Sequence, residues 1–240
     1  TTTAPEEVTP EAELIFITTP DSAIQEVCGG IARSGGFHPG QIVVHTSGAL
    51  PSTILTSAKE KGALIASVHP LQSFADVSEA VKIIPSSIFN LEGDQEAIPF
   101  LMDLVQALGG KPLSIETSQK TLYHAGAVVA CNFLVTLIYF SYNLFETIGI
   151  PHEDAAQALL PLIKGTVNNI EQLGPVKALT GPIARGDVNV IRGHLEALKA
   201  VDPRFTDIYR AVSRLTVEVG IKKGTILPER AEEILQLLKA

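Results

Sequence analysis

The sequence predicts an α/β fold built on a parallel sheet, followed by an all-α region. The first half alternates short β-branched runs with helix-like stretches, two of these runs are apolar throughout, and strand signals stop after residue 117. Alternating strands and helices are typical of parallel sheets, and continuous apolar runs are typical of strands that helices cover on both faces. We therefore expect a doubly wound sheet in residues 1–116 and a helical domain in residues 117–240.

Five segments have the composition of strands. They are residues 14–19, 41–47, 63–69, 83–91 and 111–116, and the helices expected between them are 21–34, 51–61 and 94–108. Pro85 should weaken the fourth strand, because proline cannot donate a hydrogen bond to a neighbouring strand. Pro99 should kink the helix around it or delay its start.

The first strand resembles a middle strand of such a sheet rather than its beginning. No glycine-rich turn joins it to the next helix, and Gly29–Gly30 and Gly35–Gly36 instead flank the end of a helix. We therefore expect that the chain lacks an N-terminal strand–helix–strand segment of roughly 50 residues.

About five helices are expected after residue 117. Glycine and proline separate them at Gly149 with Pro151, Gly174 with Pro175, Asp202 with Pro203, and Pro228. Residues 125–145 are nearly apolar, so we expect a helix that is buried by its own domain and by a second subunit. A membrane span is the alternative, but Asn132 and other polar residues interrupt the run, and no Lys or Arg flanks it.

Composition excludes several classes of protein. Of the 240 residues 45% are hydrophobic and 18% charged, which is typical of a folded globule. A net charge of -8 without a basic run disfavours nucleic acid as a partner. Cys28 and Cys131 are far apart, with no CxxC motif, so we expect no disulfide framework, no metal site, and a reducing cytoplasm. The N-terminal residues do not resemble a signal peptide.

Polar side chains gather on the helix that follows the last strand. Lys120, Tyr123 and His124 share one face of it, and Asn132 lies two to three turns further along. Alanine, valine and leucine surround them and exclude water. These four residues are therefore candidates for chemistry.

Four segments carry a resemblance to a known family. They are AELIFITTPDSAI (12–24), ASVHPLQSF (66–74), KTLYHAGAVVACN (120–132) and ALTGPIARGD (178–187). They resemble an uncharacterised family of Rossmann-like NAD(P)-binding proteins with a helical C-terminal domain of unknown function. That family is akin to pyrroline-carboxylate reductases, ketopantoate reductases, prephenate dehydrogenases and deazaflavin-dependent NADP reductases.

The resemblance implies a homodimeric, NAD(P)-dependent oxidoreductase. It would act on a small carbonyl, imine or hydroxy substrate in the cleft between the domains, and it would dimerise through the C-terminal helices. The resemblance favours NADP over NAD. A nucleotide-binding sensor or scaffold dimer without turnover is the alternative, because a fold alone does not decide function.

Two turns would hold the dinucleotide at the carboxyl edge of the sheet. One would lie along the nicotinamide ribose and pyrophosphate, and the other would approach the nicotinamide: they are Thr18, Thr19, Pro20 and Asp21, and Thr46, Ser47 and Gly48. In the alternative interpretation, Thr19 or Asp21 only caps the following helix, and the second turn is only a polar turn before Pro51.

Substrate and catalytic roles follow from the same resemblance. His69, in a turn similar to that of prephenate dehydrogenases, would bind a substrate oxygen or the carboxamide, with Ser73 and Tyr123 nearby. Lys120 and Asn132 resemble the catalytic lysine and asparagine of hydroxyacid dehydrogenases. Hydride delivery needs a proton donor, which Lys120 or His124 could supply. Thr180 and Arg185 would face the substrate, with Arg185 clamping a carboxylate or phosphate.

Overall fold

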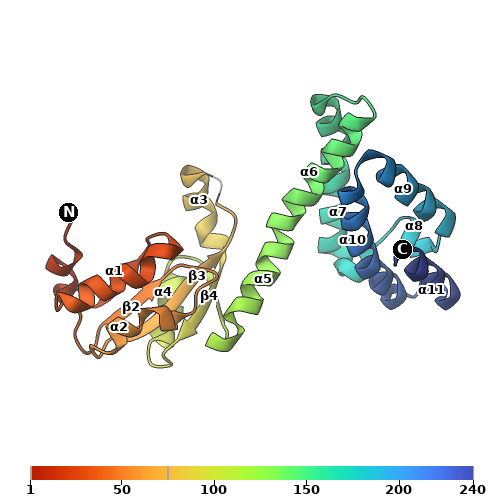
Figure 1. Ribbon diagram of the computed structural model, residues 1–240. Helices are drawn as coiled ribbons and strands as arrows, with labels where there is room; N and C mark the ends of the chain where they lie inside the picture. The colour runs from red at the N-terminus through yellow and green to blue at the C-terminus, as the bar shows by residue number, and fades with distance from the viewer. Residues whose placement is uncertain (1, 75, 240) are drawn as a thin grey trace. The chain divides into compact units, whose positions relative to one another are not determined.

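The computed structural model describes residues 2–74 and 76–239 of the chain. The chain divides into two compact units, Thr1–Leu134 and Val135–Ala240, which are described separately here. The first holds the sheet and the second holds only helices within its described part (Figure 1). The domain boundary expected between residues 116 and 117 is a boundary in sequence pattern, and it stays a prediction.

The sheet confirms the predicted α/β class. Its strands, in spatial order, are β1 (Leu14–Ile17), β2 (Ile42–His45), β3 (Leu64–Leu71), β4 (Ile88–Gly93) and β5 (Lys111–Ser114). Strands β1 to β3 are parallel, β4 is antiparallel to β3, and β5 is parallel to β4. The sheet is therefore mostly parallel, with a reversal after β3 that the sequence pattern did not indicate.

The reversal follows a short helical connection. Residues predicted as the start of the fourth strand instead form the end of α3 (Val77–Ile83) and a 3-10 turn over Ile84–Ser86. Pro85 lies in this turn, so the strand begins only at Ile88. Proline supplies a fixed φ and no backbone donor, which suits a turn better than a ladder.

Helices cover both faces of the sheet. On one face, α1 (Asp21–Arg33) and α2 (Thr56–Lys59) pack on Ile15, Val43 and Ile65. On the other face, α4 (Ile98–Ala107) packs on alternate residues such as Val44 and Val68. Because side chains alternate along a strand, the residues at positions 45, 67 and 69 share the face of α1 and α2.

The helix α5 (Lys120–Ala130) leads into α6 (Asn132–Thr147). No residue of α6 is buried in the described chain, so the expectation that its own domain buries it is wrong. Residues 117–147 form a helical stretch that is long and apolar enough to cross a membrane, by length and composition only. Its apolar residues lie all round the helix, and the rest of this chain leaves them accessible. Cover by a second subunit stays a prediction.

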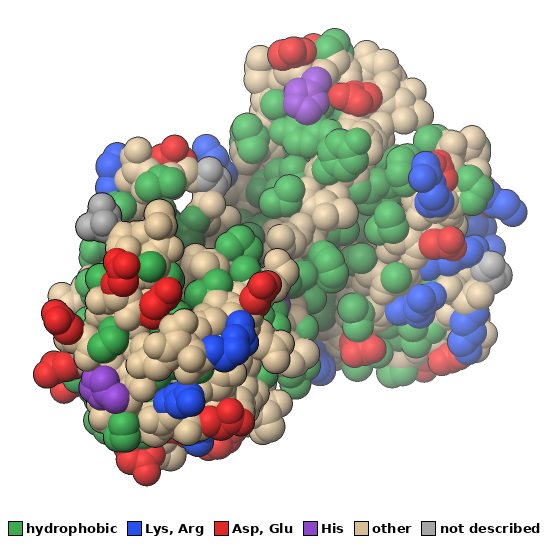
Figure 2. Space-filling model, turned by 60° about the vertical axis from the view of Figure 1, so that its left-hand side comes forward, with side chains coloured by type: hydrophobic (Ala, Val, Ile, Leu, Met, Phe, Trp, Pro, Cys, Tyr) green, Lys and Arg blue, Asp and Glu red, His purple; other side chains and the backbone are tan. Residues whose placement is uncertain are grey.

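The second unit is built from helices that begin near the predicted breaks. They are α7 (His152–Ala178), α8 (Pro182–Arg185), α9 (Val188–Val201), α10 (Pro203–Lys223) and α11 (Pro228–Leu237). At the start of α10, the Asp202 side chain accepts a hydrogen bond from the Arg204 amide. Gly174 has non-helical backbone angles, with a φ of 76° and a ψ of 161°, so the range of α7 joins two helices that are separated at the predicted break. Figure 2 shows hydrophobic side chains at the surface of this unit.

Candidate functional site

The first turns of α5 lie along β3. Lys120 contacts Ser67, and one turn later Tyr123 contacts His69. Residues two apart on a strand are about 6.6 Å apart, and one helical turn rises about 5.4 Å. Because these spacings are similar, successive turns of α5 can contact alternate residues of β3. The shared helix face predicted from sequence therefore faces one edge of the sheet.

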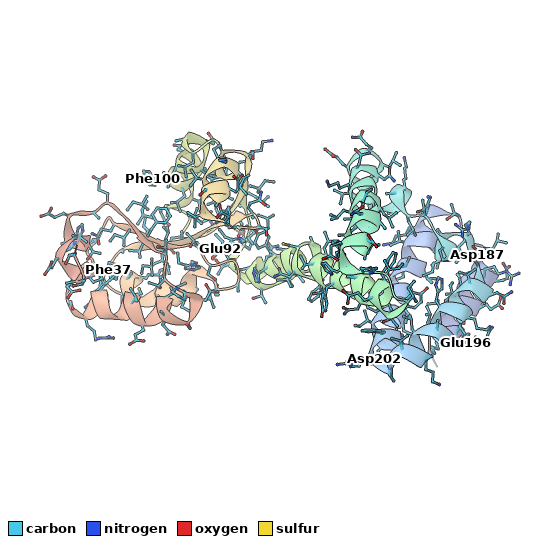
Figure 3. All side chains as sticks on the ribbon, turned by 90° about the horizontal axis from the view of Figure 1, so that it is seen from above. Phe37, Glu92, Phe100, Asp187, Glu196 and Asp202 are labelled. Carbon is cyan, nitrogen blue, oxygen red and sulfur yellow. The ribbon has the colours of Figure 1, made fainter. Side chains whose placement is uncertain are left out.

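Lys120 is held inside a buried polar network. Its side chain has an exposed fraction of 0%, and Nζ donates to Ser67 Oγ at 2.5 Å. Nζ also lies 4.0 Å from Oε1 of Glu92, whose side chain is equally buried. In Figure 3, Glu92 lies where α5 begins.

Glu92 is held by three further donors. Its carboxylate accepts hydrogen bonds from the amide and hydroxyl of Ser52 at 2.7 and 2.8 Å, and from Thr117 Oγ1 at 2.8 Å. A buried ion pair is tolerated when its remaining hydrogen-bonding capacity is satisfied in this way. The network therefore fixes the start of α5 on the sheet and keeps the Lys120 ammonium group away from solvent.

One turn after Lys120, α5 brings a second ionisable group, Tyr123, against His69 of β3. His69 Nδ1 and the Tyr123 hydroxyl are 3.0 Å apart. The rings of His69 and His124 make an edge contact with centroids 6.2 Å apart. These three side chains therefore form one cluster, within the reach expected of groups that share a ligand.

The surroundings set the protonation of this cluster. Burial first, and then the charges of Lys120 and His124, lower the pKa of His69 to about 4. Burial raises the pKa of Tyr123 to about 12. Burial also lowers the pKa of Lys120 to about 8, against the opposing effect of Glu92. At neutral pH, His69 is thus uncharged, Tyr123 keeps its proton, and most of the Lys120 population is charged.

A cavity of about 580 Å³ opens beside the cluster in the first unit. The predicted site residues that line it are His69, Ser73, Tyr123, His124 and Asn132. Apolar side chains form much of its wall, namely Leu71, Leu113, Ala127, Val128 and Ala130. The structure thus brings five of the predicted residues to one pocket, whereas Lys120 is not among the residues that line it.

Gly48 lies directly against the two histidines. A Cβ at this position would lie 2.6 Å from His69 Nε2 and 2.7 Å from His124 Cδ2. Such distances are too short for real contacts, so only glycine fits without movement of the rings. The turn of residues 46–48 therefore meets α5 and β3 at the same place.

The Ser47 hydroxyl joins the two predicted cofactor turns. It donates to Asp21 Oδ2 at 2.8 Å and accepts from the amides of Ala49 and Leu50. The Ser67 hydroxyl in turn donates to the Ser47 carbonyl at 3.4 Å. The loops after β1 and β2 are thus connected to each other and to Ser67 in the middle of β3. The carboxyl ends of β1 and β2 are where ligands bind in open α/β sheets.

The turn of Thr18, Thr19, Pro20 and Asp21 follows β1 at that edge. Pro20 is the N-cap of α1, and no side chain caps the helix there, so neither Thr19 nor Asp21 has the capping role of the alternative interpretation. Thr19 Oγ1 is buried and has no hydrogen-bond partner within the described chain. A buried hydroxyl without a partner is uncommon, and a bound ligand would satisfy it.

Thr180 and Arg185 lie in the second unit. Arg185 donates from Nε and Nη2 to Asp187 Oδ2 at 2.9 and 2.8 Å, within the same turn. Thr180 lines a different cavity of about 370 Å³, together with His194 and Tyr209. Contact of Thr180 or Arg185 with substrate therefore stays a prediction.

Sequence reasoning missed the partners of Lys120. Glu92, Ser67, Ser52 and Thr117 were not among the expected site residues, and the fourth strand was predicted to stop before Glu92. A carboxylate at the end of an apolar strand was an available signal, because such a group is seldom buried without a partner. Among residues 2–74 and 76–239, no group of three His, Cys, Asp or Glu side chains could hold a metal ion.

The fold and site can now be compared with known structures. The chain is similar to protein TM1727 from Thermotoga maritima, with 28% identity, a TM-score of 0.75, and coverage of 88% of this chain and 80% of that chain. It is similar to the "putative NADP oxidoreductase BF3122" from Bacteroides fragilis, with 28% identity, a TM-score of 0.70, and coverage of 90% and 80%.

A more distant likeness shows the fold alone. Plasmodium falciparum pyrroline carboxylate reductase, with NADP bound, is 12% identical, with a TM-score of 0.54 and coverage of 91% of this chain and 81% of that chain. No curated protein matches the sequence. A family model for a Rossmann-like domain matches residues 1–70, and one for the domain of unknown function DUF2520 matches residues 87–216. The chain therefore belongs to the DUF2520 family and combines that domain with a Rossmann-like domain, as the resemblance predicted.

Proposed function

We propose that this protein is an NADP(H)-dependent oxidoreductase that acts on a small carbonyl, imine or hydroxy compound. One observation carries the proposal: the loop after β2 and the β3 residues Ser67 and His69 meet the polar face of α5 beside a cavity of about 580 Å³. Ser47 links this loop to Asp21 at the start of α1. The 28% identical protein from Bacteroides fragilis bears the name of an NADP oxidoreductase, which supports the choice of cofactor.

The residues at this edge suit a dinucleotide. The partnerless Thr19 hydroxyl is available for a ribose or phosphate oxygen, and Asp21 is fixed beside it by Ser47. Gly48 lacks a side chain where the loop after β2 meets both histidines, so the two imidazole rings can lie directly against the backbone of this turn. When bound, a nicotinamide cofactor supplies the hydride chemistry, and the protein supplies orientation and electrostatics.

The cavity residues would orient the substrate. Tyr123 and His69 offer hydrogen bonds to a carbonyl oxygen or an imine nitrogen, and Ser73 and Asn132 line the same space. Leu71 and the alanines of α5 exclude water from it. The prediction that the substrate also contacts the helical domain through Arg185 is retained as part of this proposal.

We further propose that the protein works as a homodimer in the cytoplasm. The support is the apolar surface of α6, where Val135 has an exposed fraction of 65% and Tyr139 one of 66%. Exposed apolar patches of this kind mark interfaces between proteins or with membranes. A second copy would remove the α6 side chains from water without any change of fold.

Cofactor binding and turnover can be measured separately. Isothermal titration of the full-length protein with NADPH and with NADH should give micromolar affinity for NADPH and weaker binding of NADH. Thr19→Val should weaken NADPH binding roughly tenfold, the value of one hydrogen bond to a charged or polar ligand. The control, Thr166→Val, changes an exposed threonine of α7 and should leave affinity unchanged.

Oxidation of NADPH, followed by absorbance with a panel of small ketones and imines, then tests the reaction. Turnover of any member supports the oxidoreductase. Tight NADPH binding without turnover of any member supports the sensor alternative, and no binding of either dinucleotide contradicts the proposal.

A further inference from the structure

Lys120 and Tyr123 lie one turn apart on α5 but in different surroundings. Lys120 is enclosed by Ser67 and Glu92, whereas Tyr123 lines the cavity and is paired with His69. We propose that Lys120 is a positioning residue, and that the Tyr123 hydroxyl, hydrogen-bonded to His69, gives the proton to the substrate. This inference rests on the proposed oxidoreductase function.

The position of Lys120 rules against direct proton donation. Its side chain has no exposed surface. Its ammonium group donates a hydrogen bond to Ser67 and is paired with the carboxylate of Glu92. A general acid must come within about 3 Å of the atom that it protonates, or reach it through one water. To do so, Lys120 would have to leave a buried carboxylate without its counter-ion, which typically costs several kcal/mol.

Tyr123 meets the geometric requirement. Tyr123 lines the cavity, and its hydroxyl lies 3.0 Å from His69 Nδ1. If His69 carries its single ring proton on Nδ1, that N–H donates to the Tyr123 oxygen, and the tyrosine proton is free to point into the cavity.

The proposed step balances in protons and electrons. In a reduction, the carbonyl carbon gains the hydride, with its electron pair, that the cofactor supplies. The O–H bond of Tyr123 breaks and an O–H bond forms on the substrate oxygen. The phenolate that remains accepts the hydrogen bond from His69 Nδ1–H and takes a proton back from water.

Lys120 serves this step by acting on His69. The charged or titratable groups that act on His69 come from every neighbouring element: Lys120, Tyr123 and His124 from α5, His45 from β2, and Asp21 from α1. Burial disfavours the imidazolium most, and the cation of Lys120 adds to this effect while its contact with Ser67 fixes the register of α5 on β3. An uncharged His69 retains one proton, which is the condition for its role beside Tyr123.

The first test is nuclear magnetic resonance of the histidine side chains in the wild-type protein. His69 is assigned by comparison with His69→Gln among the 6 histidines of the chain. Its ¹⁵N shifts should show an uncharged ring with the proton on Nδ1 from pH 5.5 to 8. A ring that titrates near its ordinary pKa, or that carries its proton only on Nε2, would overturn the proposal.

The second test removes the cation. In Lys120→Met the pKa of His69 should rise, since the charge of Lys120 is, after burial, the next cause that lowers it. The control Lys111→Met changes an exposed lysine at the start of β5 and should leave His69 unchanged. If Lys120→Met does not fold, Lys120→Met/Glu92→Gln removes both buried charges together. A His69 pKa that stays constant in a folded variant contradicts the role of Lys120, because a purely structural lysine would alter stability only.

The third test uses turnover of a substrate found with NADPH. Tyr123→Phe should lower kcat by about 10² to 10⁴ with NADPH affinity unchanged, and Lys120→Met should lower it less. The reverse order of effects would make Lys120 the donor and refute the inference. The magnetic resonance result does not need turnover, so failure of the oxidoreductase proposal and failure of this inference can be distinguished.

Discussion

Replacing Gly48 by alanine is the most direct perturbation of the candidate site. The added Cβ would lie 2.6 Å from His69 Nε2 and 2.7 Å from His124 Cδ2, whereas ordinary contact begins at 3.4 Å. The rings must therefore retreat by about 0.8 Å, or the turn of residues 46–48 must move. His69 is the less free of the two, because Tyr123 holds its Nδ1.

Two effects set the size of the loss. Overpacking of a well-packed site costs about 1–3 kcal/mol. Loss of the hydrogen bond between His69 and Tyr123 would add about 0.5–1.5 kcal/mol. We therefore expect Gly48→Ala to lower the free energy of unfolding by about 1.5–4.5 kcal/mol, and to weaken NADPH binding if the nicotinamide lies against this turn.

Gly126→Ala is the matched control on α5. A Cβ at Gly126 meets nothing within 4 Å, and alanine favours a helix over glycine by about 1 kcal/mol. Urea unfolding should thus show a loss of stability for Gly48→Ala and a small gain for Gly126→Ala. Equal stability of Gly48→Ala and wild type would show that the histidine rings are not held as described, and our account of this site would fail.

Three further predictions concern α6, Lys120 and α10. Sedimentation should show a dimer at micromolar concentration, and Val135→Glu should dissociate it, while a wild-type monomer would contradict the proposed interface. Because the folded pKa of Lys120 is about 8 and its unfolded value is 10.5, the free energy of unfolding should rise between these pH values. Lys120→Met should abolish this rise. If the variant shows the same pH profile as the wild type, the rise does not come from Lys120. Asp202→Ala removes the side-chain cap of α10 and should lower the melting temperature in thermal unfolding, whereas the control Asp207→Ala, at an exposed position, should leave it nearly unchanged.

Local sequence signals predicted much of the fold. Proline set helix starts correctly at Pro203 and Pro228, and Pro99 lies at the delayed start of α4. The strand predicted at residues 83–91 exists but begins only at Ile88, because periodicity alone cannot separate the start of a buried strand from a helix end and a turn. Burial of α6 failed as a prediction for the single chain, since composition shows that a helix needs cover but not what provides it.

The candidate site was predicted in part for a physical reason. Helical spacing placed Lys120, Tyr123 and His124 on one face, and the structure keeps them there. Spacing cannot show which member of such a face is enclosed and which is accessible, because that depends on strands far away in the sequence. The enclosure of Lys120 comes from Ser67 and Glu92, which are 53 and 28 positions before it.

Strand direction links these observations. Since β4 is antiparallel to β3, Glu92 lies directly opposite Ser67 rather than at the carboxyl edge beyond it. Since β5 is parallel to β4, the chain leaves β5 at the same end of the sheet, and α5 begins there with Lys120 in contact with Ser67. The helix then runs in the direction of β3, past His69 and toward the edge where Gly48 lies. In an all-parallel sheet, α5 would begin at that edge, and its first turn could not bury a lysine against Glu92 while its second turn met the histidine. The reversal after β3 therefore separates the ammonium group from the cavity and leaves the tyrosine hydroxyl there.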